Sequence, residues 1–225
     1  MKGLHFMSRP IRITKPAVTP TAPVQFSNPL KVFQQRIGVE PDGAFGPTTF
    51  KAAKKYLNLT HEQAVHFFAQ CAHETGEFTL WEENLNYSAS SLRRVFKKYY
   101  KTDAAAKAHA RKPKLIGDTV YGGRMGNAPD EGYKFRGRGA IQLTGRDNYE
   151  EFAEAMNNPA IVTNPDIVEL EYAFESALFY FNKNNLWRLT KDLSYNTCKK
   201  VTRAVNGGYN GLEHRWHLTN IYADW

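Results

Sequence analysis

The sequence predicts a mostly α-helical protein. Apolar residues recur every three or four positions through most of the chain, which is the period of a helix with one buried face. Residues that start and stop helices stand at the ends of these stretches, as at Thr60 with Gln63 and at Gly76. The alternating pattern of a strand is nearly absent, apart from the short apolar run 140–143. We therefore expect an α-helical fold with one small β element.

Length and composition are those of a folded protein with a substantial core. The 225 residues fit one large domain, or one domain with a small appendage, and 42% of them are hydrophobic. No run approaches the roughly 18 to 20 apolar residues of a membrane helix, so we expect no stable membrane insertion. The first residues, MKGLHFMSRP, contain no apolar stretch typical of a signal peptide, which predicts synthesis in a cytosol.

The net charge of +8 favours a polyanionic partner. Nucleic acid, an anionic cell-wall polymer and an anionic membrane surface all fit this charge, which does not choose among them. The two cysteines, Cys71 and Cys198, match no metal-ligand spacing and are expected to be buried, reduced thiols.

The first 59 residues divide into two segments. Residues 1–27 are rich in proline, which excludes a helix and predicts an extended arm. Residues 28–59 predict two short helices around the sequence PDGAFGPTT. This segment resembles part of a peptidoglycan-binding repeat, with the core D-G-x-F-G-x-x-T. It fits equally well a helical hairpin packed on the main domain, because it has too few apolar residues for a core of its own.

The third predicted helix begins with the capping box of Thr60 and Gln63 and ends before Gly76. Phenylalanine and alanine residues form its wide apolar stripe, and Glu74 lies in its last turn at the edge of the buried face. Burial and the negative end of the helix dipole both disfavour an ionised carboxylate. The sequence therefore predicts a raised pKa for Glu74.

Further helices are predicted along the rest of the chain, within one domain that spans residues 60–225. The span 117–140 is rich in glycine and has no helical period, and the stretch 164–181 is expected to form the longest helix. The other predicted helices contain residues 92–99, 103–111, 149–156, 198–205 and 212–216.

The stretch AHETGEFTLWEENLNYS contains four carboxylates within ten residues of one another: Glu74, Glu77, Glu82 and Glu83. A pair of carboxylates facing one cleft can hydrolyse a glycosidic bond, one as general acid and the other as general base. The break at Gly76 permits a turn that brings Glu74 and Glu83 together, but composition and spacing alone favour the alternative, ordinary surface charges. A zinc peptidase is not indicated, because the second histidine of H-E-x-x-H would fall at Glu77.

A second candidate stretch is FRGRGAIQLTGRDNYEEF, residues 135–152. In an extended segment Gln142 and Thr144 would point to one face, as in a strand that lines a cleft. An ordinary strand that leads into a helix is the alternative. The single RGRG sequence also allows a weak RNA-binding interpretation.

Four motifs together carry a resemblance to a known family. AHETGEF, EENLNYS, FRGRGAIQLTGRDNY and VNGGYNG occur in this order, and the sequence from about residue 60 to the end resembles the family 19 glycoside hydrolases, the chitinase-like lysozymes, most of all their phage endolysin branch. The resemblance implies a lysozyme-like, two-lobed α-helical fold with a small β element beside a sugar cleft. It also implies inverting hydrolysis of β-1,4 glycosidic bonds, with no metal or cofactor.

The resemblance assigns roles to individual residues. Glu74 matches the general acid, Glu83 the general base, and Thr144 the hydroxyl that helps to hold the attacking water. One departure is Glu77, which stands where the family often has a second glycine. The residues that match substrate-binding positions are His73, Tyr87, Gln142, Asn148, Asn206 and Arg215.

The expected function is that of a peptidoglycan hydrolase that works as a monomer. It would be made in a host cytoplasm and would act on the periplasmic or extracellular cell wall, with no nucleic-acid partner. Three other functions remain open at this point: a chitinase, a wall-binding protein without activity, and a nucleic-acid-binding protein.

Overall fold

A computed structural model describes residues 26–225, so the predicted arm at residues 1–27 lies almost wholly outside the described part of the chain. The described residues are mostly helical, and their β pairing consists of two isolated bridges, Glu82–Arg138 and Arg138–Leu143. The prediction of a mostly α-helical fold is confirmed. In chain order the helices are α1 (Pro29–Arg36), α2 (Pro47–Tyr56), α3 (His61–Glu74), α4 (Ala89–Val95), α5 (Asp103–His109), α6 (Pro113–Tyr121), α7 (Arg146–Met156), α8 (Ala160–Thr163), α9 (Ile167–Glu171), α10 (Ala173–Lys183), the 3-10 helix η1 (Leu186–Leu189), α11 (Tyr195–Asn206) and α12 (Leu212–Ala223).

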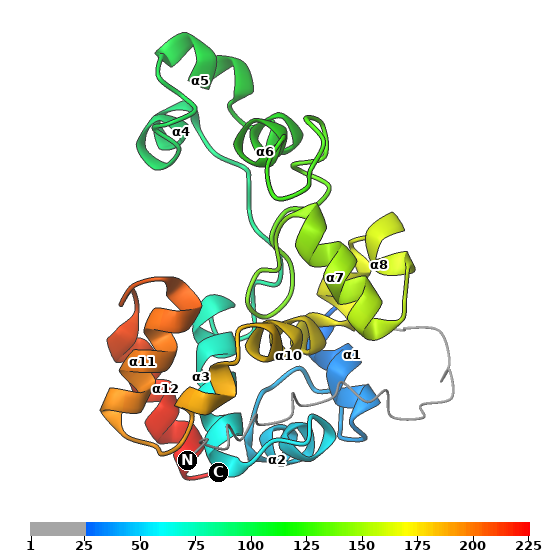
Figure 1. Ribbon diagram of the computed structural model, residues 1–225, viewed down its shortest axis with the longest axis vertical. Helices are drawn as coiled ribbons and strands as arrows, with labels where there is room; N and C mark the ends of the chain where they lie inside the picture. The colour runs from blue at the N-terminus through cyan, green and yellow to red at the C-terminus, as the bar shows by residue number, and fades with distance from the viewer. Residues whose placement is uncertain (1–25) are drawn as a thin grey trace, which may run out of the picture.

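The main hydrophobic core surrounds α3, the longest helix in the described residues. Helix α3 begins with the predicted capping box, in which the Thr60 side chain accepts from the backbone of Gln63 and the Gln63 side chain accepts from the backbone of Thr60. Phe67 and Phe68 on α3 are fully buried, and Phe174 on α10 packs on Phe68. We call the body formed by α1–α3 and α10–α12 the large lobe (Figure 1).

Residues 28–59 share this core with the rest of the large lobe. Asn28 caps α1 through its side chain, and Pro47 starts α2 as predicted. Phe33 and Phe50 are buried, and they contact Phe174 and Phe68 respectively. This is the packing expected of a helical hairpin on the main domain. Affinity of the segment for cell wall stays a prediction.

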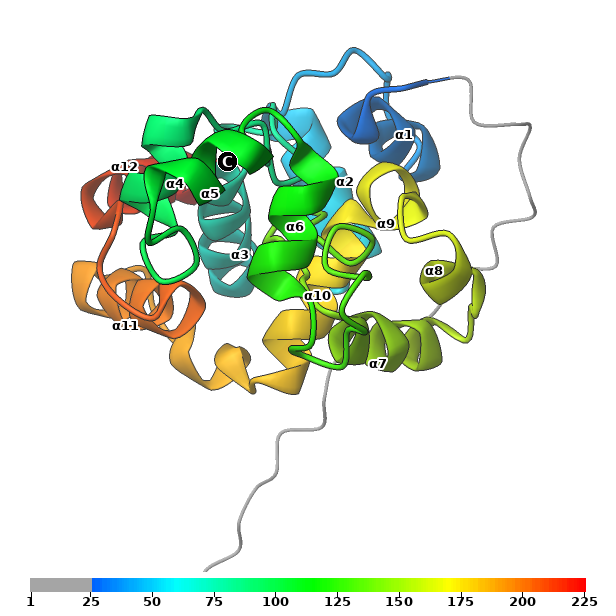
Figure 2. The same cartoon turned by 90° about the horizontal axis from the view of Figure 1, so that it is seen from above.

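Helices α4, α5 and α6 form a separate body with a small core of its own, which we call the small lobe (Figure 1). Leu92, Tyr100 and Ile116 are among its buried residues. Figure 2 looks down on this lobe, with α3 and α10 of the large lobe behind it. The sequence placed residues 117–140 in an aperiodic span, which is wrong for 117–121 because these residues belong to α6. Glycine at position 117 concealed the helix; its Cα hydrogens face the backbone of Tyr133, where a Cβ would meet atoms at 2.8 Å.

The predicted long helix 164–181 is two helices, α9 and α10, with a break at Tyr172. The carbonyl oxygens on both sides of Tyr172 accept hydrogen bonds from outside the helix. That of Glu171 accepts from Arg36, and that of Ala173 accepts from the backbone N–H of Ala140. Helical periodicity continues through the break, so the sequence pattern does not reveal it. The second core cluster, between α7, α8, α9 and α10, includes Phe152, Ile161 and Val168.

The segment 140–143 is a tight turn and not the extended strand that the sequence predicted. Arg138 and Leu143 exchange two backbone hydrogen bonds, N to O 3.1 Å and 2.8 Å, which close the turn. Gly139 and Gln142 both have positive φ, +81° and +59°. A left-handed residue at 142 interrupts the alternation of side chains on which the strand interpretation depended.

Two further expectations concern the thiols and the membrane. Cys71 and Cys198 are both buried and free of a disulfide, as predicted. Within residues 26–225, no helix has the length and apolar character needed to span a membrane.

Candidate active site

Glu74 is the last residue of α3, and its carboxylate contacts a buried guanidinium. Arg215, on α12, is fully buried and donates from Nη2 to Glu74 Oε1 at 2.5 Å and from Nη1 to Gln70 Oε1 at 2.5 Å. The Glu74 side chain is 24% exposed. The purely apolar surroundings predicted for Glu74 are therefore wrong, because an arginine 141 residues away in the chain completes them.

The chain reverses directly after Glu74 through a left-handed turn. Gly76, Glu77 and Phe78 have φ of +55°, +58° and +64°. Thr75, which is fully buried, holds this turn: its hydroxyl donates to the carbonyl of Cys71 and accepts from the N–H of Phe78. The predicted break at Gly76 is thus a specific turn that leads the chain away from the axis of α3.

Glu77 points to a histidine pair. Its Oε1 lies 3.4 Å from His214 Nε2, and the Glu77 side chain is 65% exposed. The other ring nitrogen of His214 lies 2.9 Å from Nδ1 of His73. Burial, followed by the charge of Arg215, lowers the pKa of His73. Glu77 is thus a solvent-exposed partner of His214 and makes no hydrogen bond to Glu74.

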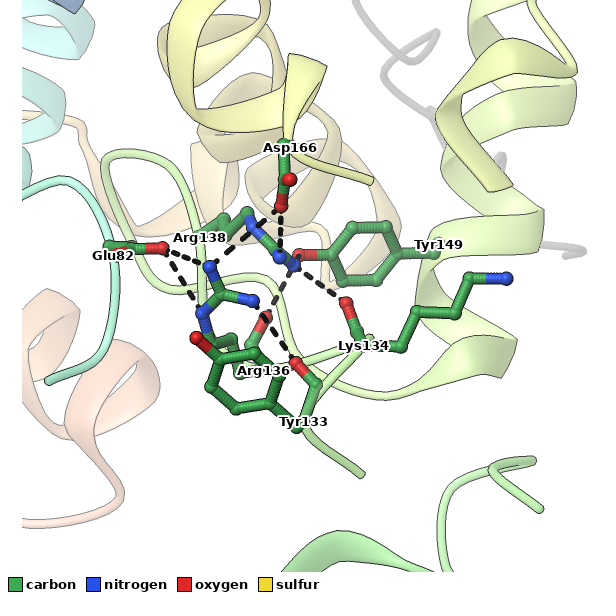
Figure 3. Close-up of polar contacts among 7 residues, drawn as sticks. All are labelled: Glu82, Tyr133, Lys134, Arg136, Arg138, Tyr149 and Asp166. Carbon is green, nitrogen blue, oxygen red and sulfur yellow. Dashed lines mark hydrogen bonds and ion pairs between the residues drawn. The ribbon is translucent and has the colours of Figure 1, made fainter. Parts of the chain in front are cut away.

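Glu82 is held by an ion pair with Arg136, as Figure 3 shows. Arg136 donates to Glu82 Oε2 from Nε at 3.1 Å and also from Nη2, and its guanidinium lies over the ring of Tyr133. The Glu82 side chain is 41% exposed. Its carboxylate is therefore engaged in a structural contact.

Glu83 lies between the two lobes and is tied to the small one. The hydroxyl of Tyr121, the last residue of α6, donates to Glu83 Oε1 at 2.7 Å. Burial raises the pKa of Glu83, opposed by hydrogen bonds from Tyr121 and the backbone of Gly137. Burial and the charge of Glu83 together raise the pKa of Tyr87, which places Tyr87 beside this carboxylate. Burial thus acts on Glu83, a carboxyl for which the sequence did not predict it.

The segment around Gly137 is fixed by two arginines that lie mostly inside the protein (Figure 3). Arg138 is 1% exposed; it donates to the carbonyl of Lys134 at 2.8 Å, to the hydroxyl of Tyr149 at 3.1 Å and to Asp166. Tyr149 in turn donates to the carbonyl of Arg136 at 2.9 Å. Both arginines of RGRG are engaged internally, which argues against the RNA-binding interpretation of this sequence.

Gln142 and Thr144 meet at Gly137, next to Glu83. A Cβ on Gly137 would lie 2.9 Å from Gln142 Oε1 and 3.2 Å from Thr144 Oγ1. The carbonyl of Gly137 accepts from the N–H of Glu83 at 2.9 Å. The two side chains are therefore brought to one place by a turn, although not by the strand that was predicted. Glycine at position 137 is required there, since any side chain would displace them.

The other predicted binding residues are distributed around these contacts. Asn148 supports Thr144, because its Nδ2 donates to the carbonyl of Thr144 at 2.8 Å, and its Oδ1 accepts from Lys183. Asn206 is exposed at the end of α11, ahead of the turn at Gly207. Of the predicted substrate-binding set, Tyr87, Gln142 and Asn148 lie on the Glu83 side of the site, while His73 and Arg215 lie at Glu74.

A cavity of about 410 Å³ adjoins Glu83. Its lining includes residues 79–86 together with Pro113, Tyr133, Arg136 and Glu169. Glu83 lines this cavity and Glu74 does not, so the cavity marks the Glu83 side of the site. Among residues 26–225, no group of three or more histidine, cysteine or acidic side chains is arranged to hold a metal ion.

Sequence reasoning missed two residues that contact the candidate site, Tyr121 and Gln70. Tyr121 follows an aperiodic, glycine-containing stretch, so no local pattern pointed to it. Gln70 lies in the apolar stripe of α3 and is fully buried, and a buried amide needs a polar partner, which here is Arg215. A polar residue in an otherwise apolar stripe was the available signal.

Comparison with known proteins identifies the family. The chain is 38% identical over 160 residues to a "Glycosyl hydrolase family 19 domain-containing protein" of Haemophilus influenzae, and the match covers 69% of this chain and 76% of that protein. The chain belongs to glycosyl hydrolase family 19. It is a glycoside hydrolase, and its substrate is a glycan polymer. No family model matches the chain.

Comparison with solved structures finds chitinase structures at 17% sequence identity. A variant of chitinase C superposes with a TM-score of 0.49, over 88% of this chain and 94% of that one. Chitinase C from Streptomyces griseus gives 0.44, over 91% and 94%. At these values the family 19 assignment depends on the sequence relative alone.

The left-handed backbone conformation at Glu77 is one that favours glycine. A glycine, which the family often has at this position, adopts positive φ without steric cost, whereas glutamate does so with strain. Glutamate at this position therefore places backbone strain in an exposed turn.

Proposed function

We propose that this family 19 enzyme hydrolyses the β-1,4 glycosidic bonds of bacterial peptidoglycan by inversion, with Glu74 as general acid and Glu83 as general base. The observation that carries the proposal is the environment of Glu83. Its carboxylate is half-buried with a raised pKa, it is oriented by Tyr121, and it adjoins Gly137, where the hydroxyl of Thr144 lies. A carboxylate with a raised pKa is a stronger proton acceptor, which suits a general base.

Glu74 is suited to the complementary role. Arg215 fixes its Oε1, and no hydrogen bond within residues 26–225 engages its Oε2. The proton of the acid form would therefore reside on Oε2, where it can reach a glycosidic oxygen. Arg215 is itself immobilised by Gln70 and by the carbonyl of Asn210, so the position of the acid depends on α3 and α12 together.

The proposed reaction moves two protons in one displacement. Glu74 gives its proton to the glycosidic oxygen as the bond between that oxygen and the anomeric carbon breaks. A water held by Glu83 and Thr144 attacks the same carbon from the opposite face, and Glu83 accepts the proton that this water loses. Glu74 then takes up a proton from solvent and Glu83 releases one, which restores the starting state.

Peptidoglycan is the proposed polymer because the protein is basic. Its net charge of +8 complements the anionic polymers of a bacterial wall, whereas chitin carries no charge to attract it. We propose that the enzyme is made in a host cytoplasm, in the manner of a phage endolysin, and acts as a monomer on the periplasmic or extracellular wall. Residues 28–59 would add weak affinity for that wall.

Mass spectrometry of digested peptidoglycan tests this function. Purified peptidoglycan incubated with the enzyme should release muropeptides with new reducing sugars, and the sugar at the new end identifies the bond cut. Glu74→Gln should release none while keeping the fold. The proposal fails if Glu74→Gln digests peptidoglycan as fast as the unchanged enzyme does.

Chito-oligosaccharides are the second candidate substrate, since a family 19 enzyme acting on β-1,4-linked N-acetylglucosamine would use the same two carboxylates. Turnover on chitin and on peptidoglycan, measured side by side, separates the two substrates. Binding to either polymer without release of reducing ends would instead indicate a wall-binding protein without activity.

A further inference from the structure

The positive charge of this protein is concentrated in the small lobe. Residues 89–121 carry nine lysine and arginine side chains against two aspartates, a net charge of +7, and the whole chain has +8. Residues 1–25 carry four more basic side chains and no acidic one, so the remaining residues, 26–88 and 122–225, have a net charge of −3 (8 − 7 − 4). The nine basic residues are Arg93, Arg94, Lys97, Lys98, Lys101, Lys107, Arg111, Lys112 and Lys114.

These nine side chains all belong to exposed residues, and few of them are neutralised within the lobe. Arg93 pairs with Asp103 at 2.9 Å, and Lys114 pairs with Asp118 at 2.6 Å. The other seven make no ion pair within residues 26–225. Like charges at this density repel one another, so the unpaired basic side chains lower the stability of the isolated lobe. An anionic ligand would relieve this repulsion.

The basic surface reaches the candidate active site. Arg111 donates from Nη1 to the carbonyl of Asn86 at 2.9 Å, and Asn86 lines the cavity beside Glu83. Pro113, between Lys112 and Lys114, lines the same cavity. The hydrogen bond from Tyr121 to Glu83 joins the end of α6 to the general base. A glycan bound at Glu83 would therefore have the basic lobe beside it.

We propose that the small lobe recognises the carboxylates of the peptides attached to the glycan strand, and that it thereby selects peptidoglycan over uncharged glycans. This inference rests on the proposed function. Peptidoglycan carries peptides with free carboxylates on alternate sugars, whereas chitin has acetamide and hydroxyl groups only. Exposed charge complementarity raises the rate of encounter and is screened by salt, so the selection should weaken as ionic strength rises.

The test uses a variant of the full chain in which three unpaired lysines of the small lobe are neutralised, Lys97→Gln, Lys98→Gln and Lys112→Gln together. None of the three contacts Glu74 or Glu83. Each exposed charge contributes roughly a two- to threefold effect, so kcat/KM on intact peptidoglycan at low salt should fall roughly tenfold. The loss should disappear at about 0.5 M salt, where the screening length is only a few ångströms.

The matched control neutralises three exposed basic residues of the large lobe, Arg188→Gln, Lys191→Gln and Lys200→Gln together. It changes net charge equally and should leave kcat/KM on peptidoglycan within about twofold. Two further substrates complete the comparison: glycan strands freed of peptides by an amidase, and a chito-oligosaccharide. On the uncharged chito-oligosaccharide the small-lobe variant should match the unchanged enzyme. On peptide-free strands, which keep one lactyl carboxylate per disaccharide, its loss should be smaller than on intact peptidoglycan.

Each other outcome overturns the inference in a recognisable way. Equal losses on all substrates would show that the lysines act through folding, and no loss on peptidoglycan would remove the role of the lobe. A loss on peptide-free strands as large as that on intact peptidoglycan, with none on the chito-oligosaccharide, would assign the charge to another anion. Tight binding of a short DNA duplex, lost in the small-lobe variant while hydrolysis is unchanged, would assign the lobe to nucleic acid. An unchanged enzyme that cuts only the chito-oligosaccharide would refute the proposed function itself.

Discussion

Replacing Tyr121 with phenylalanine tests the proposed role of Glu83 through one hydrogen bond. The Tyr121 hydroxyl donates to Glu83 Oε1 at 2.7 Å, and this bond favours the ionised carboxylate, opposing the burial that raises the pKa of Glu83. In Tyr121→Phe, burial still raises the pKa of Glu83, and only the hydrogen bond from Gly137 and the charge of Arg136 still lower it. The pKa of Glu83 should therefore rise further. The general base would then stay protonated, and inactive, up to a higher pH.

The size of the effect follows from the strength of such a bond. Hydrogen bonds to charged groups contribute about 1.5 to 3 kcal/mol, and the half-buried position of Glu83 favours the lower end. A loss of about 1.4 kcal/mol corresponds to tenfold in an equilibrium constant. At pH values on the acidic side of the profile, we therefore expect about tenfold lower kcat/KM in Tyr121→Phe.

The assay is the pH dependence of kcat/KM, whose acidic limb reports the ionisation of the base in the free enzyme. The acidic limb should move to higher pH, and activity should approach that of the unchanged enzyme on the plateau. Tyr100→Phe is the matched control, because its hydroxyl lies in the same lobe and contacts His109 at 3.2 Å. An acidic limb that stays in place in a folded Tyr121→Phe would refute the reasoning.

Three further predictions concern the turn, a buried histidine and the stereochemistry. Glu77→Gly should raise the free energy of unfolding by up to about 1 kcal/mol in urea titrations and keep activity, because φ of +58° suits glycine; a loss of stability would contradict this. Burial lowers the pKa of His66, so below about pH 6.5 the unfolded chain binds a proton that the folded protein excludes. Stability should therefore fall as the pH drops below that value, and His66→Gln should flatten the dependence between pH 7 and pH 5; an equal slope in both proteins would show that other groups cause it. NMR of a chito-oligosaccharide digest should show the α-anomer first, and a β-anomer at the earliest times would exclude inversion.

Much of the fold was predictable because its signals are local. The capping box at Thr60 and the glycine turn after α11 satisfy backbone groups within a few residues. The proline at the start of α2 has no N–H that would need a partner there. Local sequence could not reveal the break at Tyr172, since that break depends on Arg36 and on the backbone of Ala140. The turn at Gln142 was missed for a similar reason: a glutamine gives no sign of a positive φ.

The motifs proposed the candidate residues, but they did not reveal the contacts that surround those residues. The ordered motifs selected Glu74 and Glu83, and the structure shows that the exposed side chains of Glu77 and Glu82 pair with His214 and Arg136. The expected apolar environment of Glu74 was wrong, because Arg215 arrives from the last helix. Tyr121 was not foreseen, since it belongs to another lobe and no spacing rule connects it to Glu83.

The most direct test of the catalytic pair compares four single variants on peptidoglycan: Glu74→Gln, Glu77→Gln, Glu82→Gln and Glu83→Gln. Release of reducing ends per minute is the measurement, with circular dichroism confirming that each variant is folded. Glu74→Gln and Glu83→Gln should each lose at least about a hundredfold in rate, the typical contribution of a general acid or base. Glu77→Gln and Glu82→Gln should stay within about tenfold of the unchanged enzyme. A folded Glu83→Gln that keeps full activity while Glu82→Gln loses it would contradict the assignment of the base.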